Sequence, residues 1–164
     1  MKIMVITSVQ PQAGKTTLAV NLAMGLGGKG YDCILIDMGK ELEAQQWLGR
    51  VGLIPCGSFS ALEQVQTNPV PVDFVIVDLD LVHTDAVQIL PLAHAVWLVV
   101  NLEDGVNSES LHNCDKRLKA TRGAGADVVV PYQVNLREWQ NNERKLLSLV
   151  DYFGEERIAS PVPG

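Results

Sequence analysis

The sequence predicts a three-layer α/β domain built on a mostly parallel sheet. Short apolar runs of strand length recur along the chain, and helical patterns separate many of them. The runs are continuously apolar rather than alternating, as strands buried on both faces are. Strands that alternate with helices in this way are typical of a parallel sheet covered on both sides, whose ligands bind beyond the carboxyl ends of the strands.

Each expected element follows from a local pattern. Strands are predicted at residues 3–6, 33–36, 74–77, 95–100 and 128–134, with a weaker candidate at 157–159 and a loop at 52–58. The spacing of Leu18, Leu22, Ala23 and Leu26 predicts a helix that ends among the glycines of residues 25–30. Leu111, Cys114 and Leu118 predict a second helix within residues 108–121, and Thr84 with Asp85 predicts the start of a short helix that breaks near Pro91.

Length and composition favour one globular domain spanning residues 1–164. Hydrophobic residues make up 47% of the chain and charged residues 20%, which is typical of a packed core. The net charge of −6 and the lack of a basic run argue against direct nucleic-acid binding. No segment approaches the ~20 apolar residues of a transmembrane helix. Three widely spaced cysteines predict reduced thiols and a cytosolic protein.

The stretch SVQPQAGKTT, residues 8–17, follows the first expected strand and opens the first expected helix. Its end suits a phosphate-binding loop, which makes the predicted fold one of P-loop NTPase type. Gly14 allows the backbone to approach phosphates, Lys15 can reach the β and γ oxygens, and the Thr16 hydroxyl can bind Mg²⁺. Ala13 and Thr17 complete the predicted nucleotide contacts. Val9 stands where the full pattern has glycine, so a plain strand-to-helix turn with an exposed lysine is the alternative.

Two aspartates strengthen the prediction. Asp37 follows the second expected strand and Asp78 the third. Because the carboxyl ends of parallel strands share one edge, both carboxylates should lie beside the loop, where they can bind Mg²⁺ or orient an attacking water. We therefore expect Lys15, Asp37 and Asp78 to act in catalysis, and Thr16 with Asp78 to bind the metal. Each aspartate is also consistent with capping a helix or a turn.

The order MKIMVITSVQPQAGKTTLAVNLA, CILIDMG, DFVIVDLDLVHTDA, AVWLVVN, VVVPYQVN and IASPVP resembles the ParA/MinD family of deviant Walker A ATPases over nearly the whole chain. The resemblance implies ATP or ADP with Mg²⁺ as ligands. It matches Lys15 and Thr16 to the phosphate lysine and the magnesium threonine, and Asp78 to the aspartate of the third strand. Asn135 matches an asparagine that contacts adenine, although a turn role is equally consistent with its position.

The sequence departs from the family pattern at four positions. Gln10 stands where the family has a lysine that reaches the partner's nucleotide across a dimer interface. Pro11 removes a backbone donor, and Gln12 replaces a glycine, so that its Cβ restricts the backbone. Gly39 replaces an aspartate that resembles a water-orienting group. Since the binding core is intact and a transition-state cation is worth a factor of ~10³ or more, we expect nucleotide binding with slow or absent hydrolysis.

The resemblance implies a switch protein that forms a nucleotide-dependent homodimer and localises or recruits an unidentified protein partner. The eroded loop resembles the CpaE/TadZ branch, proteins associated with placing pilus machinery at a cell pole. The family's C-terminal membrane-targeting helix has no counterpart before Gly164, so the resemblance implies a longer C-terminal part and leaves peripheral membrane contact open. Two alternatives stay open: a metabolic enzyme similar to dethiobiotin synthetase, and a structural pseudo-ATPase that does not bind nucleotide.

Three further features have a second interpretation besides packing or solvation. His83 follows Asp78 in a loop where related proteins have a nucleotide-sensing switch. Trp47 lies in a region that the family uses for dimer and partner contacts. Four basic residues near the second expected helix are consistent with a small docking surface: Lys116, Arg117, Lys119 and Arg122.

Overall fold

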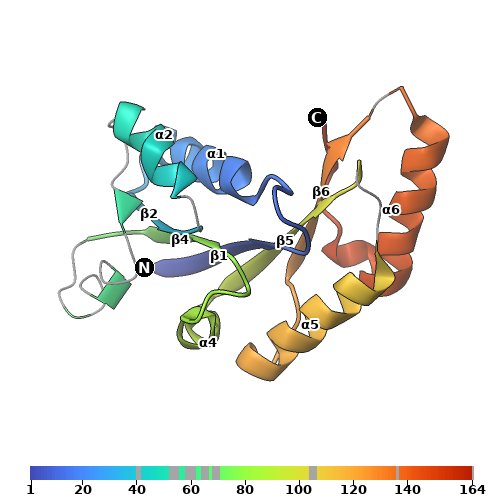
Figure 1. Ribbon diagram of the computed structural model, residues 1–164. Helices are drawn as coiled ribbons and strands as arrows, with labels where there is room; N and C mark the ends of the chain where they lie inside the picture. Colours follow the sequence, from blue (N-terminus) through green and yellow to red (C-terminus); the bar gives the residue numbers. More distant parts are fainter. Residues whose placement is uncertain are drawn as a thin grey trace.

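The computed structural model describes residues 1–39, 42–51, 56–57, 62–63, 67, 71–103, 107–135 and 137–163. Its centre is a seven-stranded sheet of order β3-β2-β4-β1-β5-β6-β7, in which every strand pairing is parallel (Figure 1). This confirms the predicted sheet. The strands are β1 (Lys2–Ser8), β2 (Cys33–Met38), β3 (Cys56–Gly57), β4 (Phe74–Leu79), β5 (Ala95–Asn101), β6 (Val128–Val134) and β7 (Val162–Pro163).

The five strands predicted from apolar runs are present, and two predictions at the sheet edges are wrong. Residues 157–159 do not form a strand, because within them only Ile158 makes an isolated bridge, to Val129. The edge strand is β7, a few residues later. The predicted loop at 52–58 contains β3, where Cys56 pairs with Leu35 of β2. Both edge strands are two residues long, too short to produce a recognisable apolar run.

The helices are α1 (Lys15–Gly28), α2 (Glu43–Val51), α4 (Ala86–Ile89), α5 (Ser108–Arg122) and α6 (Trp139–Phe153), with 3₁₀ helices η1 (Leu90–Leu92) and η2 (Glu155–Arg157). The predicted helices correspond to α1, α5 and α4 with η1. Asn107 caps α5 by accepting hydrogen bonds from the backbone N–H groups of Glu109 and Ser110. Helices α2 and α6 have no counterpart among the expected helices.

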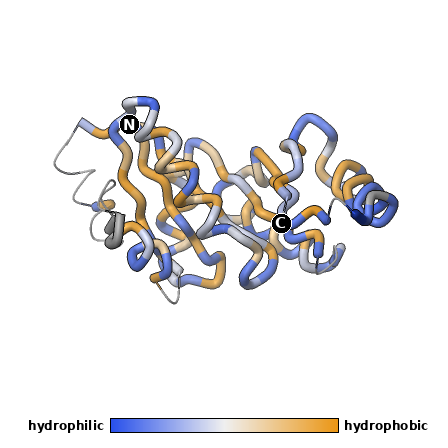
Figure 2. Tube along the Cα trace, turned by 90° about the horizontal axis from the view of Figure 1, so that it is seen from above, coloured by the Kyte–Doolittle hydropathy of each residue, from blue (hydrophilic) through white to orange (hydrophobic). Residues whose placement is uncertain are grey.

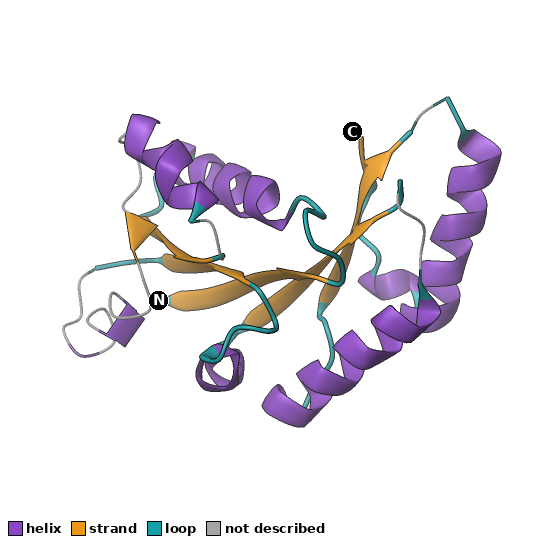
Figure 3. Cartoon of the chain, in the orientation of Figure 1, coloured by secondary structure: helices purple, strands orange, loops and turns teal. Residues whose placement is uncertain are grey.

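The helices form layers on the two faces of the sheet (Figure 3). Buried residues of α1 and α2 pack on one face against strand residues such as Ile6, Leu35 and Ile76. On the other face α4, α5 and α6 pack against residues such as Val5, Val77 and Val129. Apolar residues concentrate along the central strands (Figure 2). The predicted three-layer architecture is therefore confirmed.

Buried thiols and the lack of a spanning helix are also seen in the described residues. Cys33 and Cys114 are free and buried, and burial raises the pKa of the Cys114 thiol to about 12. Both are inert core residues, as expected. None of the helices in the described ranges combines the length and apolar character needed to cross a bilayer.

The strand order determines where a ligand can bind. β1 lies between β4 and β5, so the chain leaves β1 toward one side of the sheet and later continues on the other. In register, Ile6 pairs with Asp78 of β4, and Ser8 pairs with Val99 of β5. The carboxyl ends of these three strands converge at this reversal, where ligands bind in open α/β sheets.

Candidate functional site

The loop between β1 and α1 ends in a glycine that no other residue can replace without strain. Gly14 has φ +89°, in the left-handed region, immediately before the first residue of α1. A Cβ atom on Gly14 would lie 2.3 Å from Cε1 of Tyr132 on β6. Both the backbone conformation and the tyrosine ring therefore require glycine here.

Gln12 shows how the loop tolerates the loss of a glycine. Its φ of +54° places a residue with a Cβ in the left-handed region, at a cost of the order of 1 kcal/mol. We expected the Cβ of Gln12 to restrict the backbone, and the structure shows this residue in a strained left-handed conformation. The neighbouring Pro11 has no N–H to offer a ligand.

A pocket of about 340 Å³ opens at the first turn of α1. Of the predicted nucleotide contacts, Gly14, Lys15, Thr16 and Thr17 line it, whereas Ala13 is fully buried in the core under α1. The remaining lining residues come from the loop and from the segments after β2 and β4: Pro11, Gln12, Gly39, Leu42, Glu43 and Asp80. The N–H groups and the positive end of a helix make such a pocket suitable for anions.

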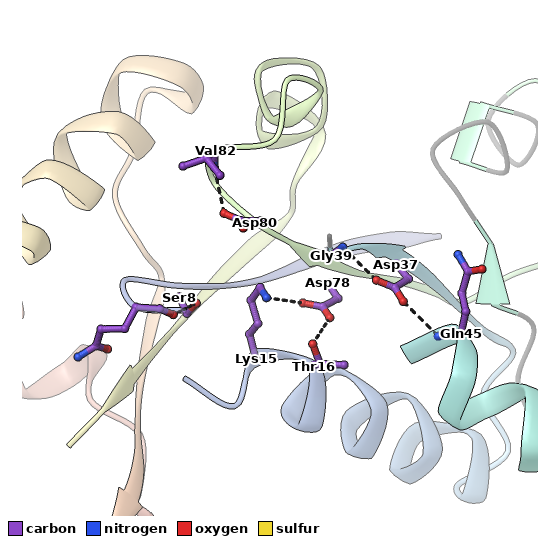
Figure 4. Close-up of polar contacts among 10 residues, drawn as sticks. Ser8, Lys15, Thr16, Asp37, Gly39, Gln45, Asp78, Asp80 and Val82 are labelled. Carbon is purple, nitrogen blue, oxygen red and sulfur yellow. Dashed lines mark hydrogen bonds and ion pairs between the residues drawn. The ribbon is translucent and has the colours of Figure 1, made fainter. Parts of the chain in front are cut away.

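Thr16 and Lys15 both point toward Asp78 (Figure 4). The Thr16 hydroxyl donates a hydrogen bond of 2.6 Å to Oδ2 of Asp78. Lys15 Nζ lies 4.0 Å from Oδ1 of the same carboxylate, and the lysine side chain is only 16% exposed. The three residues predicted to hold phosphate and metal are thus brought together at one point.

Asp78 is fully buried, and its Oδ1 has no hydrogen-bond partner among the described residues. Burial raises the pKa of this carboxyl to about 6, against the lowering effects of the Thr16 hydroxyl and the Lys15 charge, while Asp37 and Glu43 add to the rise. A buried carboxylate oxygen without a donor is costly unless a cation or donor reaches it.

Asp37 has the partners of a capping residue. It is buried, its Oδ1 accepts from the N–H of Gly39 at 3.0 Å, and its Oδ2 accepts from the N–H of Gln45, in the first turn of α2, at 3.1 Å. Both oxygens therefore fix the turn after β2 and the start of α2. Asp37 neighbours Asp78 in the sheet register but is not among the residues that line the pocket.

Two acidic pocket residues, Asp80 and Glu43, were not predicted. Asp80 directly follows the last residue of β4, and its Oδ1 accepts from the N–H of Val82 at 3.1 Å. The sequence signal was the alternation of the two aspartates in DLD. Glu43 reaches the pocket because α2 packs against α1, a tertiary contact without a local signal.

Asn135 lies outside the pocket. Its side chain is exposed, and its Oδ1 accepts a hydrogen bond of 3.0 Å from the N–H of Arg137, which forms an Asx turn after β6. The residue sits at the carboxyl edge of the sheet, but the structure does not bring it to the phosphate loop.

Gln10 faces β5. Its Nε2 donates to the backbone oxygen of Asn101 at 3.3 Å, and its Oε1 accepts from the N–H of Asn101 at 3.2 Å. The Gln10 amide is therefore engaged within its own chain.

The remaining candidates have local partners or lie on the surface. His83 Nδ1 lies 3.2 Å from the backbone N of Asp85, from which it accepts a hydrogen bond, and 3.7 Å from Oδ2 of the same residue. In the basic group, Lys119 pairs with Asp115 at 2.6 Å and Arg122 with Asp127 at 3.0 Å, while Lys116 and Arg117 are exposed on α5. Trp47 is 43% exposed on α2.

The donor set at the pocket suits a magnesium nucleotide. Mg²⁺ prefers oxygen ligands and is usually held by one or two protein groups together with phosphates and water. Thr16 Oγ1 and Oδ1 of Asp78 are oxygens of this kind, beside a lysine and a helix N-terminus. Among the described residues no group of three or more His, Cys, Asp or Glu side chains could hold a metal ion.

Similarity to solved structures extends over nearly the whole chain. MinD in the MinC:MinD cell division complex of Aquifex aeolicus has a TM-score of 0.72 at 19% identity, covering 99% of this chain and 81% of that one. A plasmid partition protein from Borrelia burgdorferi bound to AMPPNP has a TM-score of 0.77 at 13% identity, covering 99% and 86%. Cobyrinic acid a,c-diamide synthase from Mycobacterium smegmatis, with bound ADP and magnesium, has a TM-score of 0.81 at 14% identity, covering 99% and 86%.

No family model and no curated protein sequence matches the chain. At these identities the structural similarity concerns the fold, and it confirms the predicted fold class.

Proposed function

We propose that this chain, which has the fold of the ParA/MinD P-loop ATPases, is an ATP-binding switch that positions or recruits a protein partner. The single observation that supports this most strongly is the convergence of Lys15 and Thr16, which line the pocket at the head of α1, on the buried carboxylate of Asp78 behind them. Lys15 would contact the β and γ phosphates, and the N–H groups of Gly14 to Thr17 would bind phosphate oxygens. Thr16 and Asp78 would hold Mg²⁺, which neutralises charge on the phosphates.

Slow or absent hydrolysis is part of the proposal. Among the described residues that line the pocket, Lys15 is the one basic side chain, against the carboxylates of Asp80 and Glu43. Gln10 is neutral and engaged with Asn101, and Asp37 is engaged with the turn that it caps. A transferring phosphoryl group develops charge that needs cations and an oriented water, and Gln10 and Asp37 supply neither.

The proposal has three further parts. The chain forms a homodimer when it binds nucleotide, it acts on an unidentified protein partner, and it is located in the cytoplasm. The exposed apolar side chain of Val82, whose N–H bonds to the pocket residue Asp80, and that of Val87 on α4 are consistent with a contact surface. The negative net charge continues to favour a protein partner over nucleic acid.

A metabolic activity is the second candidate, because the fold is shared equally well by a diamide synthase with bound ADP and magnesium. Such an enzyme would need a second pocket for the acid that it activates. The two candidates differ in turnover: a metabolic enzyme would consume ATP rapidly when given its carboxylate substrate, whereas a switch would not.

Calorimetric titration with ADP and ATP, with and without Mg²⁺, tests the proposal. We expect binding that Mg²⁺ strengthens and that Lys15→Ala abolishes. Lys29→Ala is the matched control, because Lys29 is an exposed lysine at the opposite end of α1. Light scattering on the same samples reports dimer formation. Absence of binding to the wild-type protein would favour the pseudo-ATPase, and equal binding by the Lys15→Ala variant would refute the site.

A further inference from the structure

The two ends of the phosphate-binding loop rest on one pair of residues in the sheet. At its start, Gln10 bonds to the backbone of Asn101 at the end of β5. At its end, Gly14 lies against the ring of Tyr132 on β6. Asn101 and Tyr132 are register partners in adjacent strands. The two ends of the loop therefore contact the same residue pair of the sheet, one by hydrogen bonds and the other by close packing. We call Gln10, Asn101 and Tyr132 the loop brace.

The Gln10 amide acts as an additional peptide group. The last residue pair of the β1 and β5 ladder is Ser8 with Val99, and the Gln10 side chain continues the pairing by bonding both the N–H and the oxygen of Asn101. This arrangement needs one donor and one acceptor in a fixed geometry, which a primary amide has. A lysine has no acceptor for the Asn101 N–H.

Asn101 is a fixed anchor for this contact. It is 4% exposed. Its Oδ1 accepts from the N–H of Glu103 at 2.8 Å, and its Nδ2 donates to Oε1 of Gln133. The N–H of Leu102 donates to the oxygen of Tyr132 at 2.9 Å, which holds the two strand ends together beyond their last rung. The loop therefore bonds to a buried part of the sheet whose polar groups are hydrogen-bonded to their neighbours.

Tyr132 holds the other end by shape. Its ring occupies the volume that any side chain at position 14 would need, with three ring atoms within 2.7 Å of the place of a Cβ. The ring is half-buried and belongs to the core under α1. It limits how far Gly14, and with it the N–H groups at the head of α1, can move toward β6.

We propose that Gln10 and Tyr132 are positioning residues that hold the loop in its anion-binding shape before a nucleotide arrives. The inference rests on the proposed function for its ligand, Mg·ADP. In this chain position 10 acts on its own loop rather than on a partner's nucleotide. A loop that is already held in place loses less conformational entropy when the ligand binds. This loop needs such support because it has a proline at position 11 and a glutamine with a left-handed backbone at position 12.

Gln10→Met tests the brace, because methionine has nearly the same shape but forms neither hydrogen bond. Gln88→Met, on the exposed face of α4, is the matched control. We expect Gln10→Met to weaken Mg·ADP binding about tenfold and to speed hydrogen exchange in residues 10–17 about tenfold relative to Gln88→Met, with circular dichroism checking that both variants fold. Unchanged exchange and unchanged affinity would overturn the proposal.

The ring contact has its own pair of variants. Tyr132→Phe keeps the ring and should keep wild-type affinity and exchange, whereas Tyr132→Leu should loosen residues 10–17 and weaken binding, with circular dichroism checking that both fold. Equal behaviour of the two variants would refute the role of the ring. If the wild-type chain bound no Mg·ADP, the proposed function would fail, while hydrogen exchange in the four variants would still decide whether the brace holds the loop.

Discussion

The hydroxyl of Thr16 lies 2.6 Å from Oδ2 of Asp78, so a buried hydrogen bond joins the first turn of α1 to the end of β4. The two groups proposed to hold Mg²⁺ are thus hydrogen-bonded to each other. Among the described residues, no donor bonds the second oxygen of Asp78, which has Lys15 Nζ at 4.0 Å. This buried oxygen without a donor lowers the stability of the folded protein, and a bound cation would remove that penalty.

Asp78→Asn should stabilise the ligand-free protein at neutral and alkaline pH. The folded state holds the Asp78 proton up to a pKa of about 6, against an ordinary aspartate pKa of 3.8 in an unfolded chain. Stability from the protonated carboxyl is therefore complete below the unfolded pKa and is lost as pH rises through the folded one. Asparagine does not ionise, so we expect a gain of the order of 2 kcal/mol at pH 8 that disappears near pH 4.

Urea denaturation over this pH range measures the effect, with Asp151→Asn on the exposed surface of α6 as control. The same Asp78→Asn variant should lose the Mg²⁺ dependence of nucleotide binding. If the unfolding free energy of Asp78→Asn changed with pH as that of the wild type does, the Asp78 carboxyl would not be the cause of the pH dependence.

Two glycine variants should have opposite effects on stability. Gly14→Ala forces a Cβ into the ring of Tyr132 at a φ of +89°, so it should destabilise the fold and weaken Mg·ADP binding at least tenfold. Gly25→Ala lies within α1 with nothing within 4 Å of the new Cβ. It should stabilise the protein by about 0.5–1 kcal/mol and leave binding unchanged.

Melting curves and titrations of the two glycine variants measure both quantities. Normal binding by Gly14→Ala would mean that Tyr132 moves away at little cost, and that the loop is not held as described.

Gln10→Lys should raise ATP turnover while loosening the loop. A lysine supplies a cation that phosphoryl transfer requires, but it leaves the N–H of Asn101 without its acceptor. We expect wild-type turnover well below the roughly 1–100 s⁻¹ of kinases, and an increase of about tenfold or more in the variant. Phosphate release assays with Gln88→Lys as control check this. Wild-type turnover as fast as a metabolic kinase would contradict the assignments of Gln10 and Gly39.

Asn135→Asp separates a turn role from contact with the base. The carboxylate can still accept from the N–H of Arg137 and keep the Asx turn, but it cannot donate to adenine. If Asn135 contacts the base, as the family resemblance implies, ATP should bind more weakly and GTP relatively better. Competition titrations of the two nucleotides provide the measurement, with Asn113→Asp on the exposed face of α5 as control. An unchanged ratio would leave Asn135 with the turn alone.

The central strands and the phosphate loop were predictable because their signals are local. Five buried strands appear as uninterrupted apolar runs, and the GKTT tetrapeptide follows the first strand and opens α1. The edge strands β3 and β7 were not predictable, since two residues carry no pattern. The register irregularity between Tyr132 and Val134, where Gln133 has φ +55°, also has no sequence signal.

The site was predictable in its residues more than in their roles. Lys15, Thr16 and Asp78 meet as expected, whereas the bonds of Asp37 to Gly39 and Gln45 depend on how α2 packs. The contacts of Gln10 with Asn101 and of Gly14 with Tyr132 join residues far apart in the chain. Such contacts follow from the strand order, which no local pattern encodes.

The place of β1 between β4 and β5 also determines when the sheet can form during synthesis of the chain. Residues 2–8 leave the ribosome well before their neighbours in the sheet, Phe74–Leu79 and Ala95–Asn101. This apolar segment must remain unpaired until both of those strands have been synthesised, and such non-local pairings form slowly. We therefore expect the nascent protein to be prone to aggregation before residue 101 emerges, and the pocket at the head of α1 forms late although its loop is synthesised early.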